Sequence, residues 1–216
     1  MSAGCGKENP TPDWGRLYEI AGAQDGHFTT AQAAEVGYYP QLIAKHLANG
    51  RMTRVRRGVY RLVHFPAGDQ EELVVIWLWS GRAAIFSHET ALALHGLSDA
   101  LPARVHITLP SRWARRRLRV PKSVALHHAD IDAADRTWLG TVPVTAVPRT
   151  LVDCAEARVA PELVRDAFEH AAQRGLVDRG VVPSVVTYLE PFYSVSRDRS
   201  GSRFRSTSSR PRRVME

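Results

Sequence analysis

The sequence predicts an α+β protein in which an N-terminal winged helix-turn-helix, residues 12–65, precedes a mixed α/β domain, residues 70–190. The first part shows two short helices joined by a glycine turn and followed directly by a β-hairpin. The second part alternates β-branched segments with amphipathic helical patterns. Residues 194–216 are rich in serine and arginine and are expected to form a disordered basic tail, with residues 1–11 as a disordered lead-in.

Each element of the winged helix has a local signal. Apolar residues at helical spacing predict a helix within residues 12–25. Thr29 or Thr30 is expected to cap a short second helix, which a glycine closes. A proline opens the third helix, residues 40–48. The segment MTRVRRGVYRL, residues 52–62, then has the pattern of a β-hairpin, which makes the helix-turn-helix winged.

The helix predicted over residues 40–48 has two different faces. Ile43 and Leu47 lie on the side that is expected to face a core. The opposite side carries small and polar residues at i, i+3, i+4 and i+7, namely Gln41, Ala44, Lys45 and Ala48. Glutamine pairs bidentately with adenine and lysine reaches guanine or phosphate, so we expect this helix to read DNA.

The hairpin carries most of its charge on its tip and on one face. We expect Val55, Tyr60 and Leu62 to pack against the helices, with an Arg57-Gly58 turn in which glycine takes a positive φ. The cations expected to point outward are Arg54, Arg56 and Arg61. Short surface hairpins also carry solvated arginines, but the preceding helix-turn-helix favours a wing that contacts phosphates.

Positive charge is concentrated in separate zones of a chain whose net charge is +7. The net charge is +5 over residues 26–64, +7 over 104–122 and +5 over 195–216, whereas residues 123–194 carry −4. This distribution favours a polyanionic partner for the first part and a different role for the acidic part.

The basic run RWARRRLR lies between two predicted strands of the second domain. It is a possible second nucleic-acid surface, a site for an acidic partner, or a solvated loop. Trp113 and Leu118 interleave the arginines, so part of the run is expected to pack. The candidate contacts are Arg112, Arg115, Arg116, Arg117 and Arg119.

The second domain is expected to contain helices and strands in alternation. A largely buried helix begins near residue 71, and a second helix extends from Ser87, its expected N-cap, to Gly96. Three β-branched segments predict strands over 104–110, 123–130 and 140–148. Two helices follow, over 148–157 and 161–175, and the second has acidic residues early and an apolar stripe.

No pattern in the chain predicts catalysis, a metal site or a cofactor. In SHETALALHG, His88-Glu89 is followed by Leu92 where a zinc-protease helix needs its second histidine. His127 and His128 are adjacent in a strand, so their side chains are expected on opposite faces. The sequence contains no glycine-rich phosphate loop and no Gly-x-Ser-x-Gly motif.

The expected compartment is the cytoplasm. The chain has only two cysteines, far apart in the sequence, which suits a reducing environment. No apolar run approaches the roughly 18 residues of a membrane span, and no signal peptide is visible, so no membrane association is expected.

The segment FTTAQAAEVGYYPQLIAKHLANGRMTRVRRGVYRL resembles the winged helix of AbiEi-type antitoxins of type IV toxin–antitoxin systems. The wing residues VRRGVY carry most of this match. The second domain is similar to the same family through SHETALALHG, RVHITLP and VPVTAVPRTLVDCA, so the resemblance covers roughly residues 12–182. The serine- and arginine-rich tail departs from the family pattern.

The resemblance implies a cytoplasmic antitoxin and autorepressor. Its winged helix would bind inverted repeats in double-stranded DNA of its own promoter, with a dimer on DNA as one arrangement, and its C-terminal domain would counteract a nucleotidyltransferase-like toxin. Direct contact with the toxin is left open. Carried over by position, DNA contacts would come from Gln41, Lys45, Arg54, Arg56 and Arg57, with Tyr38 and Tyr39 stacking against the sugar–phosphate backbone.

Two other functions remain open at this point. The first is a stand-alone winged-helix regulator whose 70–190 domain senses a ligand or dimerises. The second is a protein-interaction module in which the acidic residues 123–194 dock a basic partner. A deep apolar pocket would favour the sensor, and an absence of salt-dependent DNA binding would favour the interaction module.

Overall fold

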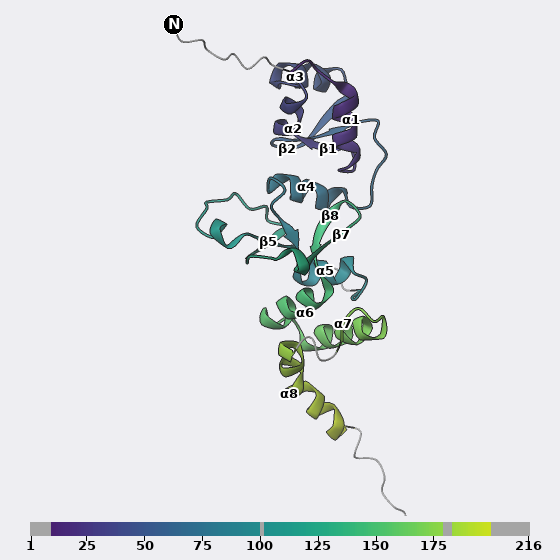
Figure 1. Ribbon diagram of the computed structural model, residues 1–216, viewed down its shortest axis with the longest axis vertical. Helices are drawn as coiled ribbons and strands as arrows, with labels where there is room; N and C mark the ends of the chain where they lie inside the picture. The colour runs from purple at the N-terminus through teal and green to yellow at the C-terminus, as the bar shows by residue number, and fades with distance from the viewer. Residues whose placement is uncertain (1–9, 100–101, 179–182, 200–216) are drawn as a thin grey trace, which may run out of the picture.

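The computed structural model describes residues 10–99, 102–178 and 183–199. The chain is arranged as successive layers along one long axis (Figure 1). The winged helix lies at one end, and a helix separates it from a second, larger sheet. The remaining helices follow on the far side of that sheet, so the two predicted domains are stacked end to end.

The winged helix forms as predicted, with one additional strand. Its elements are α1 Trp14–Gly22, β1 His27–Thr29, α2 Thr30–Glu35, α3 Pro40–Ala48, β2 Met52–Arg56 and β3 Val59–Leu62. The strand order is β1-β3-β2, and all pairs are antiparallel. Strand β1 was not predicted, because three residues are too few to show alternation. It brings Phe28 opposite Tyr60 on β3, and the two rings stack with centroids 5.9 Å apart.

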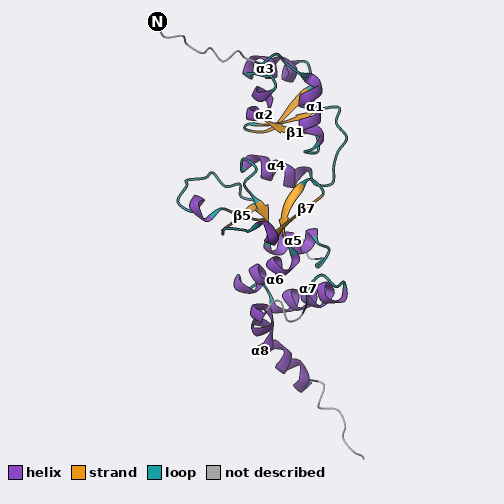
Figure 2. Cartoon of the chain, in the orientation of Figure 1, coloured by secondary structure: helices purple, strands orange, loops and turns teal. Residues whose placement is uncertain are grey.

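The second domain is built on a mixed five-stranded sheet with the order β6-β5-β4-β8-β7. Strands β4 and β8 are parallel, as are β5 and β6, whereas β4–β5 and β7–β8 are antiparallel. Figure 2 shows that α4 lies between this sheet and the three-stranded sheet of the winged helix. The elements are α4 Glu71–Trp79, β4 Ile85–Phe86, α5 His88–Leu94, β5 Val105–Leu109, the 3₁₀ helices η1 Ser111–Trp113 and η2 Ala133–Asp135, β6 Val124–His128, β7 Arg136–Leu139, β8 Val142–Thr145, α6 Val147–Glu156, α7 Pro161–Gln173 and α8 Pro183–Arg199.

Three features of the second domain differ from the sequence-based prediction. Strands β4 and β7 were not predicted, since both are short and gain their order from pairing with neighbours rather than from a local pattern. Helix α8 continues to Arg199, beyond residue 194, where the tail was expected to begin. The lead-in up to residue 9 and the tail from residue 200 lie outside the described residues.

The two domains share an ordered interface. Helix α4 contacts all three strands of the winged helix. Val59 of β3 is buried together with the apolar side chains of α4 and the larger sheet. Arg61 forms an ion pair of 2.7 Å with Glu71 and donates a hydrogen bond of 2.9 Å to the carbonyl of Phe65. These contacts hold the winged helix against α4, so the short segment between the domains does not act as a free linker.

Acid is expected to destabilise the winged helix through His27. This side chain is 1% exposed, and burial lowers its pKa below 6.5, although the Asp25 carbonyl and the Glu71 carboxylate act in the opposite direction. The unfolded chain therefore binds a proton first, and stability falls as the pH decreases below about 6.5. We expect urea unfolding at pH 7.5 and pH 5 to show a smaller loss of stability for His27→Gln than for the wild type.

His64→Gln serves as the control for this comparison, because His64 is exposed. It should retain the full pH dependence of the wild type. An identical pH dependence in the His27→Gln and wild-type proteins would contradict the prediction.

Candidate nucleic-acid interface

The turn that positions α3 is fixed by polar contacts and by one glycine. Thr29 and Gln32 form a capping box at the start of α2, and the Gln32 amide also donates to Gln24 at 2.9 Å. The turn into α3 passes through Gly37, whose φ is +83°. A Cβ atom at this position would lie 2.5 Å from the carbonyl oxygen of Pro10, so only glycine fits.

Helix α3 presents the face that the sequence predicted. Ile43 and His46 are buried against the winged-helix core. The opposite face is exposed and consists of Gln41, Ala44, Lys45 and Ala48. The two alanines have short side chains, so the helix backbone can approach a groove closely. The longer side chains of Gln41 and Lys45 extend beyond them.

The wing departs from simple alternation because β2 contains a bulge between Arg54 and Arg56. The extra residue is Val55, which is 45% exposed, so the prediction that it packs against the helices is wrong. Tyr60 and Leu62 do pack, as expected. The bulge leaves Arg56 half-buried rather than outward-facing, whereas Arg54 is exposed.

The tip of the wing is the Arg57-Gly58 turn, as predicted, and Gly58 has a φ of +79°. The Gly58 carbonyl accepts a hydrogen bond of 3.0 Å from the backbone amide of Thr30, at the start of α2. The tip is therefore tethered to the helix-turn-helix. Within the described part of the chain, neither Arg54 nor Arg57 has an ion pair or a side-chain hydrogen bond, so both guanidinium groups are available to an external anion.

Two residues predicted to contact DNA are not available on this surface. Tyr38 is 4% exposed and packs edge-on against Trp14, so its ring cannot stack on a nucleic-acid backbone. Burial also raises the pKa of its hydroxyl. Arg61 is occupied by Glu71 at the domain interface, a pairing that no local pattern revealed. Tyr39 remains half-buried at the N-cap of α3.

The second basic surface lies on the loop between β5 and β6. Its arginines are all exposed: Arg112, Arg115, Arg116, Arg117 and Arg119. Trp113 and Leu118 are half-buried and pack against the core of the larger sheet, as predicted. The guanidinium carbon of Arg116 lies 4.2 Å from the centre of the Trp113 ring. This cation–π contact anchors the loop while the other cations face solvent.

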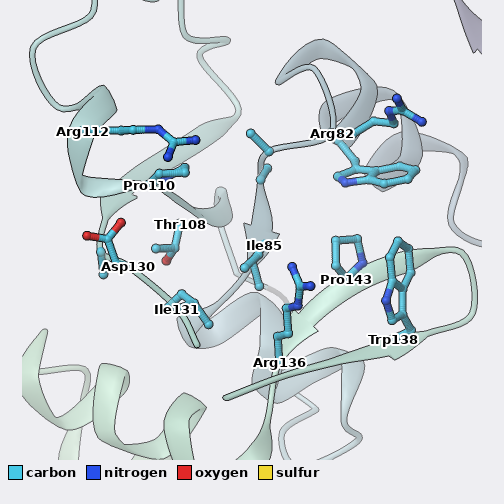
Figure 3. Close-up of a pocket in the computed structure, with 14 residues that line it drawn as sticks. Arg82, Ile85, Thr108, Pro110, Arg112, Asp130, Ile131, Arg136, Trp138 and Pro143 are labelled. Atoms are coloured by element: carbon cyan, nitrogen blue, oxygen red, sulfur yellow. The ribbon is translucent and has the colours of Figure 1, made fainter. Parts of the chain in front are cut away.

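One arginine of this loop also belongs to a cavity of about 350 Å³ that sequence reasoning missed (Figure 3). Arg82, Arg112 and Arg136 approach it from the turn after α4, from η1 and from β7. Trp77 and Trp138 also line it, with ring centroids 5.5 Å apart. These side chains come from four separate segments, so no sequence motif joins them.

Together, the tethered hairpin, the glycine turn and the exposed face of α3 define a winged helix-turn-helix with a cationic wing, which is an architecture of DNA-binding regulators.

Residues 16–63 match the family described as "Transcriptional regulator, AbiEi antitoxin", which confirms the resemblance over that segment. No curated protein matches the chain. Among solved structures, it is similar to the RV2827C protein from Mycobacterium tuberculosis, with 15% identity over 88% of this chain and 80% of that chain and a TM-score of 0.42. None of the helices within the described ranges is long and apolar enough to cross a membrane.

Proposed function

We propose that the protein is a DNA-binding antitoxin that represses its own promoter. The observation that carries this proposal is the pairing of an exposed α3 face of short side chains with a tethered wing, on which Arg54 and Arg57 have no partner among the described residues. The match of residues 16–63 to a family of antitoxin transcriptional regulators supports the same function.

In the proposed complex, α3 enters the major groove and the wing lies along the adjacent backbone. Gln41 reads a base edge, and Lys45 reaches guanine or phosphate from the next turn of the helix. Arg54 and Arg57 neutralise phosphates and fix the orientation of the domain. Because α4 holds the winged helix against the second domain, the whole chain would dock as one unit.

The antitoxin part of the proposal assigns the second domain a role against a nucleotidyltransferase-like toxin. It is supported by the family to which the N-terminal segment is similar, and the geometry of the second domain does not select a toxin. A neighbouring gene for such a toxin should arrest growth when expressed alone. Co-expression of the full chain should restore growth, and failure to do so would exclude this part of the proposal.

Sequence readout is tested by fluorescence anisotropy with the chain's own upstream DNA and a scrambled duplex at two salt concentrations. We expect tight binding only to the upstream duplex. Gln41→Ala should reduce the preference for one base pair by about 1–3 kcal/mol while leaving the salt dependence unchanged. Equal, strongly salt-sensitive binding of both duplexes would indicate charge attraction without readout and would contradict autorepression.

A ligand-sensing regulator is the second candidate, and the cavity in Figure 3 favours it. Three arginines, one carboxylate, Asp130, and two tryptophans line the cavity, a net positive and aromatic surface that suits a small anion that carries a ring. AMP is a simple probe of this chemistry. If it changes neither the tryptophan fluorescence nor the affinity for upstream DNA, the cavity does not act as a sensor for anions of this type.

A further inference from the structure

Three histidines from separate segments meet beside the larger sheet. They are His88 at the start of α5, His106 on β5 and His127 on β6, and one ring nitrogen of each lies within 4.8 Å of the others. We propose that this histidine cluster binds one divalent transition-metal ion of the zinc class. Neutral imidazoles are the preferred ligands of such ions, whereas Mg²⁺ and Ca²⁺ require oxygen ligands.

The sheet register explains why the cluster forms. Strands β5 and β6 are parallel, and Thr108 lies opposite His127, so His106 occupies the same face two residues earlier. His88 is the first residue of α5, which follows β4, and β4 pairs with the other edge of β5. No metal-binding spacing in the sequence joins His88 and His127, because strand pairing rather than sequence spacing brings them together.

The distances suit coordination of a metal ion. His106 Nδ1 and His127 Nε2 are 3.1 Å apart. Two nitrogens bound tetrahedrally at about 2.05 Å are separated by roughly 3.3 Å, so a metal ion could replace the hydrogen bond between this pair with little movement of either ring. The rings of His88 and His127 are nearly parallel, with centroids 3.7 Å apart. Binding of the third ligand therefore requires a rotation of the His88 ring towards the common centre.

Polar groups outside the cluster orient its imidazoles. Glu89 Oε2 lies 3.0 Å from His106 Nε2, which places the His106 proton on that nitrogen and leaves Nδ1 free to coordinate. His88 Nδ1 lies 2.9 Å from the Ser87 hydroxyl, which in turn accepts a hydrogen bond of 2.8 Å from Thr108. A carboxylate partner fixes the tautomer of a metal-binding histidine, and the hydroxyl partner of His88 fixes the direction of its ring.

A cavity of about 270 Å³ lies beside the cluster, and Arg149 is among the side chains that line it. His88 and His127 line this cavity together with Asp153. Asp153 is 6% exposed, and its Oδ2 atom has no hydrogen-bond partner within the described residues, although Arg149 donates to Oδ1 at 2.7 Å. A water molecule on the metal would donate to this buried acceptor. Three histidines with an open fourth position are a known arrangement for zinc.

The test uses the full chain without a histidine tag, freed of metal by dialysis against a chelator. Titration with Co²⁺, a spectroscopic substitute for Zn²⁺, should give one bound ion per chain and the visible absorption of a tetrahedral site. Zn²⁺ should displace it and Mg²⁺ should not. His106→Gln and His127→Gln should abolish the absorption, and Glu89→Gln should weaken binding about ten- to hundredfold.

His64→Gln removes an exposed histidine of the winged helix that is not part of the cluster and should bind Co²⁺ like the wild type. Far-ultraviolet circular dichroism confirms that each variant is folded, and Glu89→Gln tests the site without removing a ligand. The proposal is overturned if the wild type binds no stoichiometric Co²⁺. It is equally overturned if folded His127→Gln protein keeps the wild-type spectrum.

Discussion

Replacing Arg54 and Arg57 together with alanine is expected to weaken DNA binding roughly thirtyfold at about 0.15 M salt. Both side chains are exposed on a wing that is tethered to α2, and neither has an internal partner among the residues described. Each lost phosphate contact removes about 0.9 from the slope of log affinity against log salt, so the slope should fall by about 1.8. Titrations at four salt concentrations measure both quantities.

The matched control removes the same charge elsewhere. Arg158 lies just after α6 and Arg165 lies on α7, and both helices are on the far side of the larger sheet from the winged helix. The Arg158→Ala, Arg165→Ala double variant should change the slope far less than the wing variant does. Equal effects of the two double variants would show that net charge, rather than the wing, governs binding.

Replacing Phe28 with alanine is expected to lower the free energy of unfolding by about 3–5 kcal/mol. Phe28 is 0% exposed, lies on the short strand β1 and stacks on Tyr60 in the separate core of the winged helix. Truncation leaves a cavity that this small core cannot fill. We expect the winged helix to unfold first and DNA binding to be lost with it, as followed by urea unfolding and anisotropy.

Phe86→Ala is the matched comparison, because Phe86 is also 0% exposed but belongs to the core of the larger sheet. It should destabilise the second domain by a similar amount while the winged helix remains folded at low denaturant and binds DNA. Unchanged DNA affinity in Phe28→Ala protein would show that the β1–β3 core does not support the recognition surface.

The helices and the hairpin of the winged domain could be predicted because their signals are local. The Thr29 capping box, the Pro40 start of α3 and the Gly58 turn each act within a few residues. Strand β1 and the bulge at Val55 could not be predicted, because both depend on register against β3. A register difference of one residue reverses which side chains are exposed, and Val55 shows this directly.

The residues of the candidate interface likewise include some that a local pattern predicts and some whose exposure depends on distant contacts. The exposed face of α3 follows from helical periodicity alone, so Gln41 and Lys45 were found correctly as surface residues. Tyr38 and Arg61 were selected by residue type, but their availability depends on neighbours that are distant in the sequence or on the other domain. Residue type shows what a side chain can bind, whereas packing determines whether it is free to do so.

The sequence by itself determined the winged helix-turn-helix and the exposed positions of Gln41, Lys45, Arg54 and Arg57, because local periodicity, caps and turns specify these features. Only the tertiary structure decided which segments meet. It paired Arg61 with Glu71, joined Arg82, Arg112 and Arg136 around one cavity, and brought His88, His106 and His127 into one cluster. Such contacts arise from strand order and register, which result from packing the whole chain and leave no fixed spacing in the sequence.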